Sequence, residues 1–384
     1  SMRVALDATL LGARFSGVER AVAQLIAALA RAGEGIEVAA YVGRHFDAYA
    51  EAFHPNGLDP TGRLVLRRVD LDNRNRAARL WWQQMVLPRL VHDAGDDLFH
   101  APAYLSPLIM GVPKVVTVYD LISIEQPQFA SRANHWNYRL MVPPGLRGAQ
   151  AISEPSEDAR AAVARVVPGV AERCRVIPLG VEERFGQADE LDVAAVRERF
   201  RLPERYLLWV GNIEPKKNVL TLLEALARLK ADGRRVPRLV LAGALSWGTH
   251  DVMRAFLQRG LQSQALFLGR VRDEELPALY AGATAFLFPS LVEGFGLPPL
   301  EAMAAGVPVV GSSRGAVAEV IGEAGLLADP TDAGAWAEAM GRVCDDEPLR
   351  ARLVAQGRVR VAQYSWDRTA RLTMDVYREL TEQG

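Results

Sequence analysis

The sequence predicts an α/β protein made of two consecutive doubly wound domains. Short apolar runs alternate with longer helical patterns along the chain, which is typical of parallel α/β architecture. This alternation stops between Glu182 and about Leu202, where the sequence turns polar and carries no strand signal, and then begins again. The chain has 384 residues, and at roughly 150 residues per domain this length suits two or three domains that each bury a core.

The first half contains six predicted strands. The first, residues 4–6, leads through Ser16 and Gly17 into a helix whose apolar residues recur at the spacing of one helical face. The other five are the apolar runs 37–42, 97–100, 115–118, 149–153 and 175–180. We therefore expect an N-terminal domain over residues 1–184.

The second half repeats the pattern with five strands, several of which end in glycine. They are the runs 206–211, 238–243, 266–269, 285–290 and 307–310. We expect residues 185–365 to form the second domain, and a helical pattern follows over residues 366–384. Because ligands bind at the carboxyl ends of the strands in doubly wound sheets, we expect the site at those ends.

Composition narrows the function classes. Lys plus Arg total 45 and Asp plus Glu total 46, and this balance argues against nucleic acid as the main partner because phosphate binding leaves a basic footprint. Cys174 and Cys344 lie far apart and in no metal-ligand spacing, which favours a reducing cytoplasm. No apolar run approaches the roughly 18 residues of a membrane span. We expect a cytoplasmic protein, with peripheral contact at the inner face of a membrane left open.

The densest cluster of informative residues lies between positions 288 and 308. A strand ends at Ser290, a glycine-rich loop follows, and two prolines favour a helix start near position 298. Glu293 then lies on the loop and Glu301 in the first turns of the helix. A lone glutamate in either place is most simply a solvated acid or a partner of the helix dipole. The pair, in one strand–loop–helix segment, favours a binding site.

The expected helix start lies between these two glutamates. Its free amides, near Gly296 and Leu297, suit an anion. Carboxylates such as Glu293 and Glu301 do not bind phosphate, but they accept hydrogen bonds from hydroxyl groups. A ligand with phosphate in the middle and hydroxylated rings at both ends fits this arrangement. The segment therefore predicts a nucleotide-sugar site.

This segment resembles the Glu-x7-Glu motif of the family-four group of retaining glycosyltransferases. Further segments match that family in the same order along nearly the whole chain: 16–20, 176–181, 207–218, 267–271 and 312–320. The resemblance implies the GT-B fold, in which two Rossmann-like domains face each other across a cleft. It also implies that the terminal helix, 366–384, crosses back to the first domain and that the first domain binds the acceptor.

The resemblance assigns roles to individual residues. It implies that Glu301 binds the ribose of the donor, that Val271 lies near the base and that Glu293 binds hydroxyls of the transferred sugar. The remaining donor contacts that it implies are Gly17, Lys216, Lys217, Phe295, Gly296 and Leu297. Glu293 and Lys217 are the expected catalytic residues, since a lysine charge on the departing diphosphate stabilises the transition state.

Two positions depart from the family pattern. The family commonly has Gly-Arg-x4-Lys, and here Asn212 replaces the arginine while Lys217 is retained, with Lys216 beside it. The family also has Thr-x-His-Asp where this chain has Thr-Val-Tyr-Asp, so Tyr119 replaces the histidine. Tyr119, Asp120 and the strand-end His100 are the expected acceptor-side residues. For His100 a purely structural role is an equal alternative.

Two further features bear on partners. No Asp-x-Asp cluster of the kind that holds a divalent cation under a diphosphate is present outside acidic surface contexts, so no metal is expected. The segment 63–89 is locally basic and contains Trp81 and Trp82, which suits contact with anionic lipid. The helical spacing of the tryptophans favours the alternative that they belong to a core helix.

These observations predict a metal-independent retaining hexosyltransferase. It would move a hexose from a nucleotide sugar to a glycan or lipid-linked saccharide acceptor in surface-polysaccharide synthesis. The amino-acid sequence of residues 211–218 resembles the corresponding segment of mannosyltransferases. The first expectation for the donor is therefore GDP-mannose, and the second is a UDP-sugar. A nucleotide-sugar epimerase of similar architecture and a non-catalytic nucleotide-sugar-binding partner protein remain as alternatives.

Overall fold

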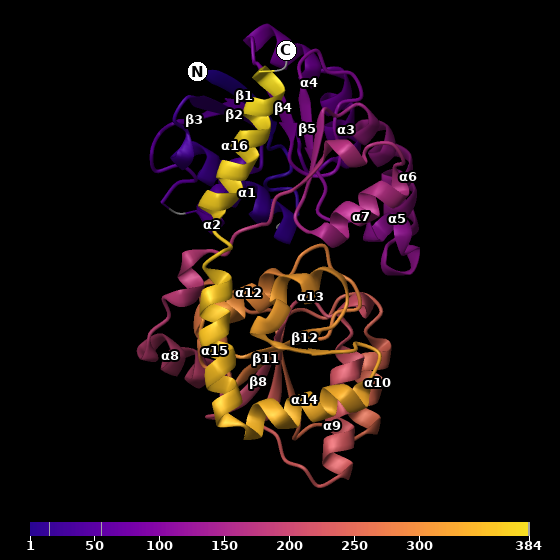
Figure 1. Ribbon diagram of the computed structural model, residues 1–384, viewed down its shortest axis with the longest axis vertical. Coiled ribbons are helices and arrows are strands. Elements are labelled where there is room, and N and C mark those ends of the chain that lie inside the picture. The colour runs from indigo at the N-terminus through magenta and orange to yellow at the C-terminus, as the bar shows by residue number, and fades with distance from the viewer. Residues whose placement is uncertain (15, 55, 383–384) are drawn as a thin grey trace. The chain divides into compact units, whose positions relative to one another are not determined.

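The computed structural model describes residues 1–14, 16–54 and 56–382 (Figure 1). The chain divides into two compact units. The N-terminal unit comprises Ser1–Gly180 together with Trp366–Gly384, and the C-terminal unit comprises Val181–Ser365. The division falls after residue 180, where the sequence analysis placed a boundary at 184. Each unit has its own parallel sheet.

The sheet of the N-terminal unit has seven strands in the order β3-β2-β1-β4-β5-β6-β7. The strands are β1 (Met2–Asp7), β2 (Ile36–Val42), β3 (Leu64–Arg68), β4 (Leu98–Ala101), β5 (Lys114–Thr117), β6 (Ala151–Glu154) and β7 (Cys174–Val176). The strand order reverses between β1 and β4, which is the switch point where doubly wound sheets bind ligands. Strand β3 was not predicted, because it is never fully buried and its residues do not form an apolar run.

Helices connect these strands. They are α1 (Gly17–Ala32), α2 (Phe46–Phe53), α3 (Arg76–Met85), α4 (Leu87–Ala94), α5 (Ile122–Glu125), α6 (Arg132–Arg147) and α7 (Glu157–Val166). Helix α1 begins where Ser16 accepts a hydrogen bond from the amide of Glu19, at 3.4 Å. Its predicted apolar face is buried. The start of α1 therefore follows directly on the loop at the end of β1.

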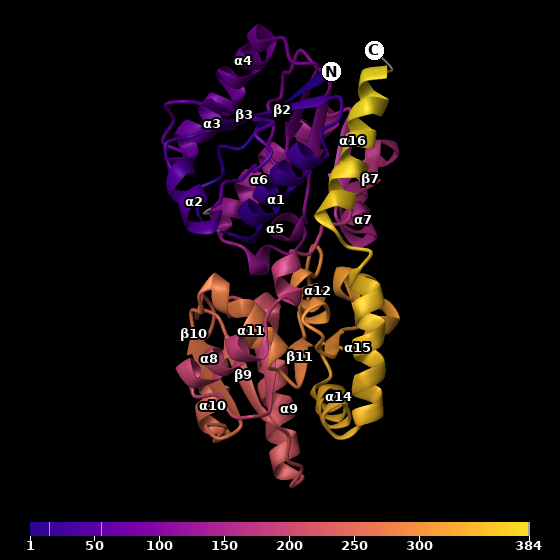
Figure 2. The same ribbon diagram turned by 90° about the vertical axis from the view of Figure 1, so that its left-hand side faces the viewer.

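The terminal helix α16 (Trp366–Glu382) packs on α1 within the N-terminal unit (Figures 1 and 2). Arg31 of α1 lies 3.3 Å from the carboxylate of Asp367, and the hydroxyl of Thr369 donates to the carbonyl of Pro178 at 2.7 Å. These contacts, together with the apolar face of α16, attach the end of the chain to the unit in which it begins.

The sheet of the C-terminal unit has six parallel strands in the order β10-β9-β8-β11-β12-β13. They are β8 (Tyr206–Val210), β9 (Arg238–Ala242), β10 (Ala265–Gly269), β11 (Ala285–Phe288), β12 (Val309–Ser312) and β13 (Leu326–Ala328). The helices are α8 (Glu190–Phe200), α9 (Val219–Ala231), α10 (His250–Gln258), α11 (Leu276–Ala281), α12 (Leu297–Ala304), α13 (Gly315–Ile321), α14 (Ala333–Asp345) and α15 (Glu347–Val361). The predicted pair of doubly wound α/β domains is confirmed, although β13 was not foreseen.

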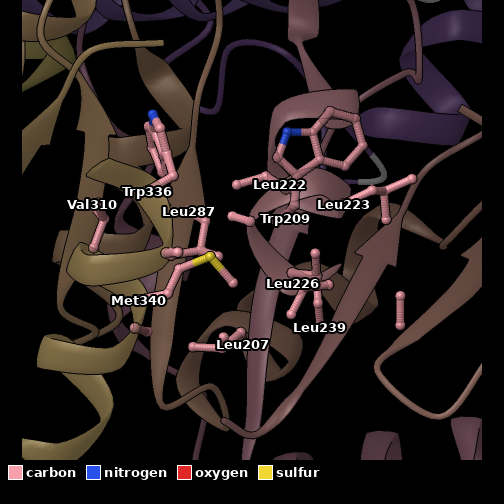
Figure 3. Packing of buried hydrophobic residues seen from close by; sticks show 14 of the residues in the cluster. Leu207, Trp209, Leu222, Leu223, Leu226, Leu239, Leu287, Val310, Trp336 and Met340 are labelled. Carbon is pink, nitrogen blue, oxygen red and sulfur yellow. The ribbon is translucent and has the colours of Figure 1, made fainter. Parts of the chain in front are cut away.

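The core of this unit lies between the sheet and helices α9 and α14. Trp209 of β8 and Trp336 of α14 are fully buried there with the leucines of α9 (Figure 3). The indole nitrogen of Trp336 donates to the carbonyl of Asp329 at 3.1 Å. Burial of apolar surface, to which these large side chains contribute, is the dominant favourable term in folding.

Two glycines close the carboxyl edge of this sheet. Gly211 and Gly243 follow β8 and β9, and a Cβ atom added to Gly243 would lie 1.5 Å from the carbonyl oxygen of Gly211. Such an approach is possible only without a side chain. The strand-then-glycine pattern therefore reflects close packing of the loops that leave adjacent strands. Among the described residues, no helix combines the length and apolar composition that a membrane span requires.

Candidate active site

The centre of the candidate site is a contact between Lys217 and Glu293. Lys217 ends the short turn after β8, and Glu293 lies on the loop after β11. These strands are neighbours in the sheet, so their following loops meet at its carboxyl edge. The ammonium of Lys217 lies 2.5 Å from Oε1 of Glu293, and the hydroxyl of Ser290 donates to the same oxygen at 3.0 Å. The two side chains are only 16% and 14% exposed.

The surroundings keep Glu293 ionised. Burial alone would raise the pKa of its carboxyl, but the charges of Lys217 and Lys216 and the hydrogen bonds from Lys217 and Ser290 outweigh burial and hold the pKa below its ordinary value. An ionised carboxylate accepts hydrogen bonds and cannot act as a proton donor. At neutral pH Glu293 is therefore suited to bind hydroxyl or ammonium groups and not to serve as a general acid.

Asn218 fixes the lysine loop, and the sequence analysis did not select it. Its backbone is left-handed, with φ of 61°, a conformation that asparagine tolerates better than most residues. Its amide nitrogen donates to the carbonyls of Pro289 and Pro330 at 2.9 and 2.7 Å. The hydroxyl of Thr221 donates to its amide oxygen at 2.9 Å. The signal available in the sequence was an asparagine directly before a helix.

Lys216 is held on the same loop. Its carbonyl accepts a hydrogen bond from the amide of Leu291 at 2.8 Å, and its ammonium lies 3.6 Å from a carboxylate oxygen of Glu214. Asn212, which replaces the arginine of the family pattern, is exposed at the end of β8. The positive charge next to Glu293 therefore comes from two consecutive lysines.

Helix α12 begins at Leu297, directly after Gly296, with two prolines in its first turn. Glu301 is half-buried on this helix. The pKa of Tyr280 lies well above its ordinary value, mainly because Tyr280 is buried and secondly because of the negative charge of Glu301. Phe295 is buried, with its ring 5.9 Å from that of Tyr364. Val271 lies half-buried in the loop after β10.

In the N-terminal unit His100 is part of the interior. Its two ring nitrogens lie 2.5 Å from the hydroxyl of Tyr377 on α16 and 2.7 Å from the hydroxyl of Thr117. Burial lowers its pKa to about 3, so the ring is neutral. Both nitrogens are engaged with protein groups, and the ring joins the terminal helix to the sheet. These contacts give His100 a structural role, which was one of the two alternatives that the sequence left for it.

Tyr119 and Asp120 adjoin a group of tyrosines. Tyr119 is buried, which raises its pKa, and its ring lies 5.8 Å from that of Tyr104. Asp120 accepts hydrogen bonds from the amide of Ile122 at 3.0 Å and from the hydroxyl of Tyr104 at 3.2 Å. Tyr119 is therefore buried and Asp120 half-buried, and Asp120 orients Tyr104.

Tyr104 forms part of a cavity of about 490 Å³ in the N-terminal unit. The cavity is bounded by the loop after β1, by α3 and by α6, and Ser16 and Val18 beside Gly17 line it. Gly17 itself is exposed at the start of α1. This cavity was not predicted, because the residues that line it come from distant parts of the chain.

The two tryptophans of the basic segment have different surroundings. Trp82 is buried in the core of the N-terminal unit, 5.9 Å from the ring of Tyr41, as the core alternative predicts. Trp81 is 63% exposed. Within the described residues, no three His, Cys, Asp or Glu side chains are grouped so as to hold a metal ion.

Comparison with known proteins gives the same class for both units. Residues 15–185 match the model of "Glycosyltransferase Family 4", and residues 194–360 match that of "Glycosyl transferases group 1". The chain is 31% identical over 292 residues to O-antigen chain mannosyltransferase B of Escherichia coli, which covers 76% of each chain.

Solved structures agree with these matches. Sucrose-phosphate synthase from Thermosynechococcus elongatus superposes over 100% of both chains with a TM-score of 0.77 at 23% identity. HepE of Anabaena, in complex with UDP and glucose, covers 99% of this chain and 100% of its own with a TM-score of 0.75 at 18% identity. The chain therefore belongs to the family-four glycosyltransferases and has the GT-B fold.

Proposed function

We propose that this glycosyltransferase moves a hexose from a nucleotide sugar to a glycan or lipid-linked saccharide acceptor in the synthesis of a surface polysaccharide. The observation that carries the proposal is the contact of Lys217 with Glu293 at the carboxyl edge of the C-terminal sheet. It joins a phosphate-binding cation to a hydroxyl-binding anion, and these are the two groups that a nucleotide sugar requires.

In the proposal, binding of the donor breaks the contact between Lys217 and Glu293. The diphosphate carries more negative charge than one carboxylate and attracts the ammonium of Lys217. Lys216 precedes Lys217 in the chain, and α12 begins at the end of the loop that carries Glu293, so both are proposed as further phosphate contacts. Glu293, still ionised, then accepts hydrogen bonds from the hydroxyls of the transferred sugar. In the same proposal Glu301 binds the ribose, and Val271 lies near the base.

The proposed transfer retains the anomeric configuration and uses no metal. The pKa of Glu293 is held below its ordinary value, so this carboxylate is a poor proton donor at neutral pH, and the proposal gives its oxygens to the hydroxyls of the transferred sugar. The departing phosphate is then the group that takes the proton of the acceptor hydroxyl, and the lysines stabilise its charge. Product analysis by NMR tests retention, and activity in the presence of EDTA tests metal independence.

Mannose from GDP-mannose is the proposed donor, and a UDP-sugar is the second candidate. The first is supported by the mannosyltransferase to which the chain is 31% identical, and the second by the fold shared with a protein solved with UDP and glucose. A thermal-shift panel of GDP-, UDP- and ADP-sugars decides between them, because a ligand that binds only the folded state raises the melting temperature. The stabilisation is expected to be lost in Lys217→Gln and kept in Lys230→Gln, whose lysine is bound to the exposed carbonyl of Gly260.

Two alternatives make different predictions. An epimerase would change the nucleotide sugar in a donor-only incubation, whereas a transferase converts the donor fully only when an acceptor is present. A non-catalytic partner would bind a donor tightly and turn over none. Glu293, Glu301 and Lys217 are all retained in this chain, which favours turnover.

The proposal includes peripheral contact with an anionic membrane. Trp81 and Met85 are exposed on one face of α3, and the amide of Leu108 donates to Gln84 at 2.9 Å, which places exposed Leu108 and its loop beside that helix. Vesicles of phosphatidylglycerol should bind the chain more strongly than vesicles of phosphatidylcholine. Trp81→Ser should weaken this binding, and Leu191→Ser, at an exposed leucine of the other unit, should not.

A further inference from the structure

The cavity of the N-terminal unit carries unpaired positive charge. Arg14, Arg76 and Arg79 all line it. Within the described part of the chain, none of these three guanidinium groups has a carboxylate within 4.0 Å. Arg76 donates to the amide oxygen of Asn134 at 2.8 Å and lies 6.0 Å from the ring centroid of Tyr138. The arginine is therefore oriented by neutral groups and keeps its charge for another partner.

The two carboxylates of the same cavity do not supply that partner. Asp7 and Glu19 are buried, and both are committed to hydrogen bonds within the protein. Asp7 accepts from the amide and hydroxyl of Thr9 at 3.0 and 2.6 Å and from the amide nitrogen of Gln83 at 2.7 Å. Glu19 accepts from the backbone amides of Arg14 and Gly12 at 2.6 and 3.2 Å. The two carboxylates thus organise the loop after β1 and do not form ion pairs with the arginine side chains of the cavity.

An aromatic wall completes the cavity. The rings of Tyr104 and Tyr138 lie 5.3 Å apart with 33° between their planes. The backbone of Tyr104 is left-handed, with φ of 65°, which is unfavourable for a bulky side chain and is characteristic of functional sites. Its hydroxyl is bound by Asp120 and its amide by the carbonyl of Thr117 at 2.9 Å. Aromatic faces with a few fixed polar groups are typical of small-molecule sites.

We propose that this cavity binds the acceptor and that the acceptor is anionic, a saccharide bearing a phosphate or carboxylate group close to the sugar ring. The ring lies against Tyr104 and Tyr138, and the anionic group lies on Arg76 and Arg79, with Arg14 at the rim. The guanidinium fork matches both phosphate and carboxylate oxygens. This inference rests on the proposed transferase function, because the cavity is assigned to the acceptor of that reaction.

The test is a titration of the full chain by isothermal calorimetry at low salt. A saturating nucleoside diphosphate, either GDP or UDP as the donor panel selects, occupies the donor site so that phosphate probes cannot bind at Lys217. The probes are mannose 1-phosphate, methyl glucuronide and the neutral methyl mannoside. We expect at least one anionic probe to bind about tenfold more tightly than the neutral glycoside, as a charge-assisted hydrogen bond allows. The two anionic probes distinguish a phosphate from a carboxylate.

Variants locate the effect. Arg79→Gln and Arg76→Gln should each reduce the preference for the anion about tenfold, and Arg79→Lys should keep most of it. Arg74→Gln is the matched control, because Arg74 is exposed in the same segment but does not line the cavity. Its preference should stay within about twofold of the unsubstituted chain. Unchanged melting temperatures show that each variant is folded.

Two outcomes overturn the inference. Equal binding of charged and neutral probes overturns it, as does an equal loss in Arg74→Gln and Arg79→Gln. If nucleotide sugars bind but the anionic probes bind no more tightly than the neutral glycoside, only this inference is refuted. Absence of binding by every nucleotide sugar instead refutes the proposed function on which it rests.

Discussion

Replacement of Lys217 by glutamine removes one member of a largely buried ion pair. The remaining carboxylate of Glu293 stays 14% exposed and loses its partner at 2.5 Å. Breaking a buried pair on one side costs about 3–5 kcal/mol. Ser290 still donates to the carboxylate and Lys216 remains nearby, so we expect the lower end, about 3 kcal/mol at pH 7. For a unit of this size that loss lowers the melting temperature by about 6–12 °C.

The stability deficit of Lys217→Gln should depend on pH in a defined direction. In the unsubstituted chain the pKa of Glu293 lies below its ordinary 4.5, so its stabilising contribution is present above pH 4.5 and is lost as the pH falls through the lowered pKa. Lys217→Gln removes two of the causes that lower this pKa and leaves burial, which raises it, so we expect the pKa of Glu293 to rise in the variant. The destabilisation is then present at pH 7 and shrinks as protonation neutralises the carboxyl. The deficit of the variant should therefore be smaller at pH 4.5 than at pH 7.

Urea denaturation followed by tryptophan fluorescence measures this deficit, because Trp209 and Trp336 lie in the core of the same unit. The double variant Lys217→Gln with Glu293→Gln should cost less than Lys217→Gln alone, since no buried charge is left. Lys230→Gln serves as the surface control. A deficit of equal size at both pH values, or costs that simply add in the double variant, would refute the assignment of Lys217 as the partner of a buried charge.

Three further predictions concern residues that support the site and the fold. Asn218→Ala should lose two hydrogen bonds to loop carbonyls and place alanine in a left-handed conformation that asparagine tolerates better. We expect the free energy of unfolding to fall by about 2 kcal/mol and donor binding, measured by calorimetry, to weaken. His100 has a pKa of about 3 against an ordinary 6.5, so stability falls as the pH drops below 6.5; the loss at pH 5 is about 2 kcal/mol and is absent in His100→Gln. Gly243→Ala places a methyl group against the carbonyl of Gly211 and should prevent the C-terminal unit from folding, which circular dichroism detects.

Each of these has a contradicting result. Asn218→Gly keeps the backbone conformation and should still lose the amide contacts, so full donor binding in that variant contradicts the role given to the side chain. A flat stability profile between pH 7 and pH 5 contradicts the neutral, buried state of His100. A folded Gly243→Ala variant contradicts the close approach of the two loops.

Local pattern was sufficient to predict the two sheets and the motif helix, but strands β3 and β13 were not predicted. Strand β3 carries two arginines and is nowhere fully buried, and only one of the three residues of β13 is buried. Strands β7 and β10, which also lie at sheet edges, were predicted. The two prolines of α12 predicted a start near position 298, one residue from the observed start at Leu297, because proline suits the first helical turn.

The contacts within the site depend on topology, which local pattern does not contain. The sequence selected Lys217 and Glu293 separately, and they touch because β8 and β11 are neighbours in the sheet. The two nitrogens of His100 are occupied by partners 17 and 277 residues away along the chain. Arg76 and Arg79 of the cavity were visible only as part of the basic segment 63–89 until the fold placed the ring of Tyr138 beside Arg76.

The most direct test of the central claim is transfer itself. The chain is incubated with the nucleotide sugar that the binding panel selects and with a saccharide acceptor, and release of the nucleoside diphosphate is measured with and without the acceptor. We predict acceptor-dependent release that falls by about 10²-fold or more in both Glu293→Gln and Lys217→Gln and is unchanged in Lys230→Gln. Full activity in either site variant, with the fold intact, would contradict the assignment of this ion pair to the donor site.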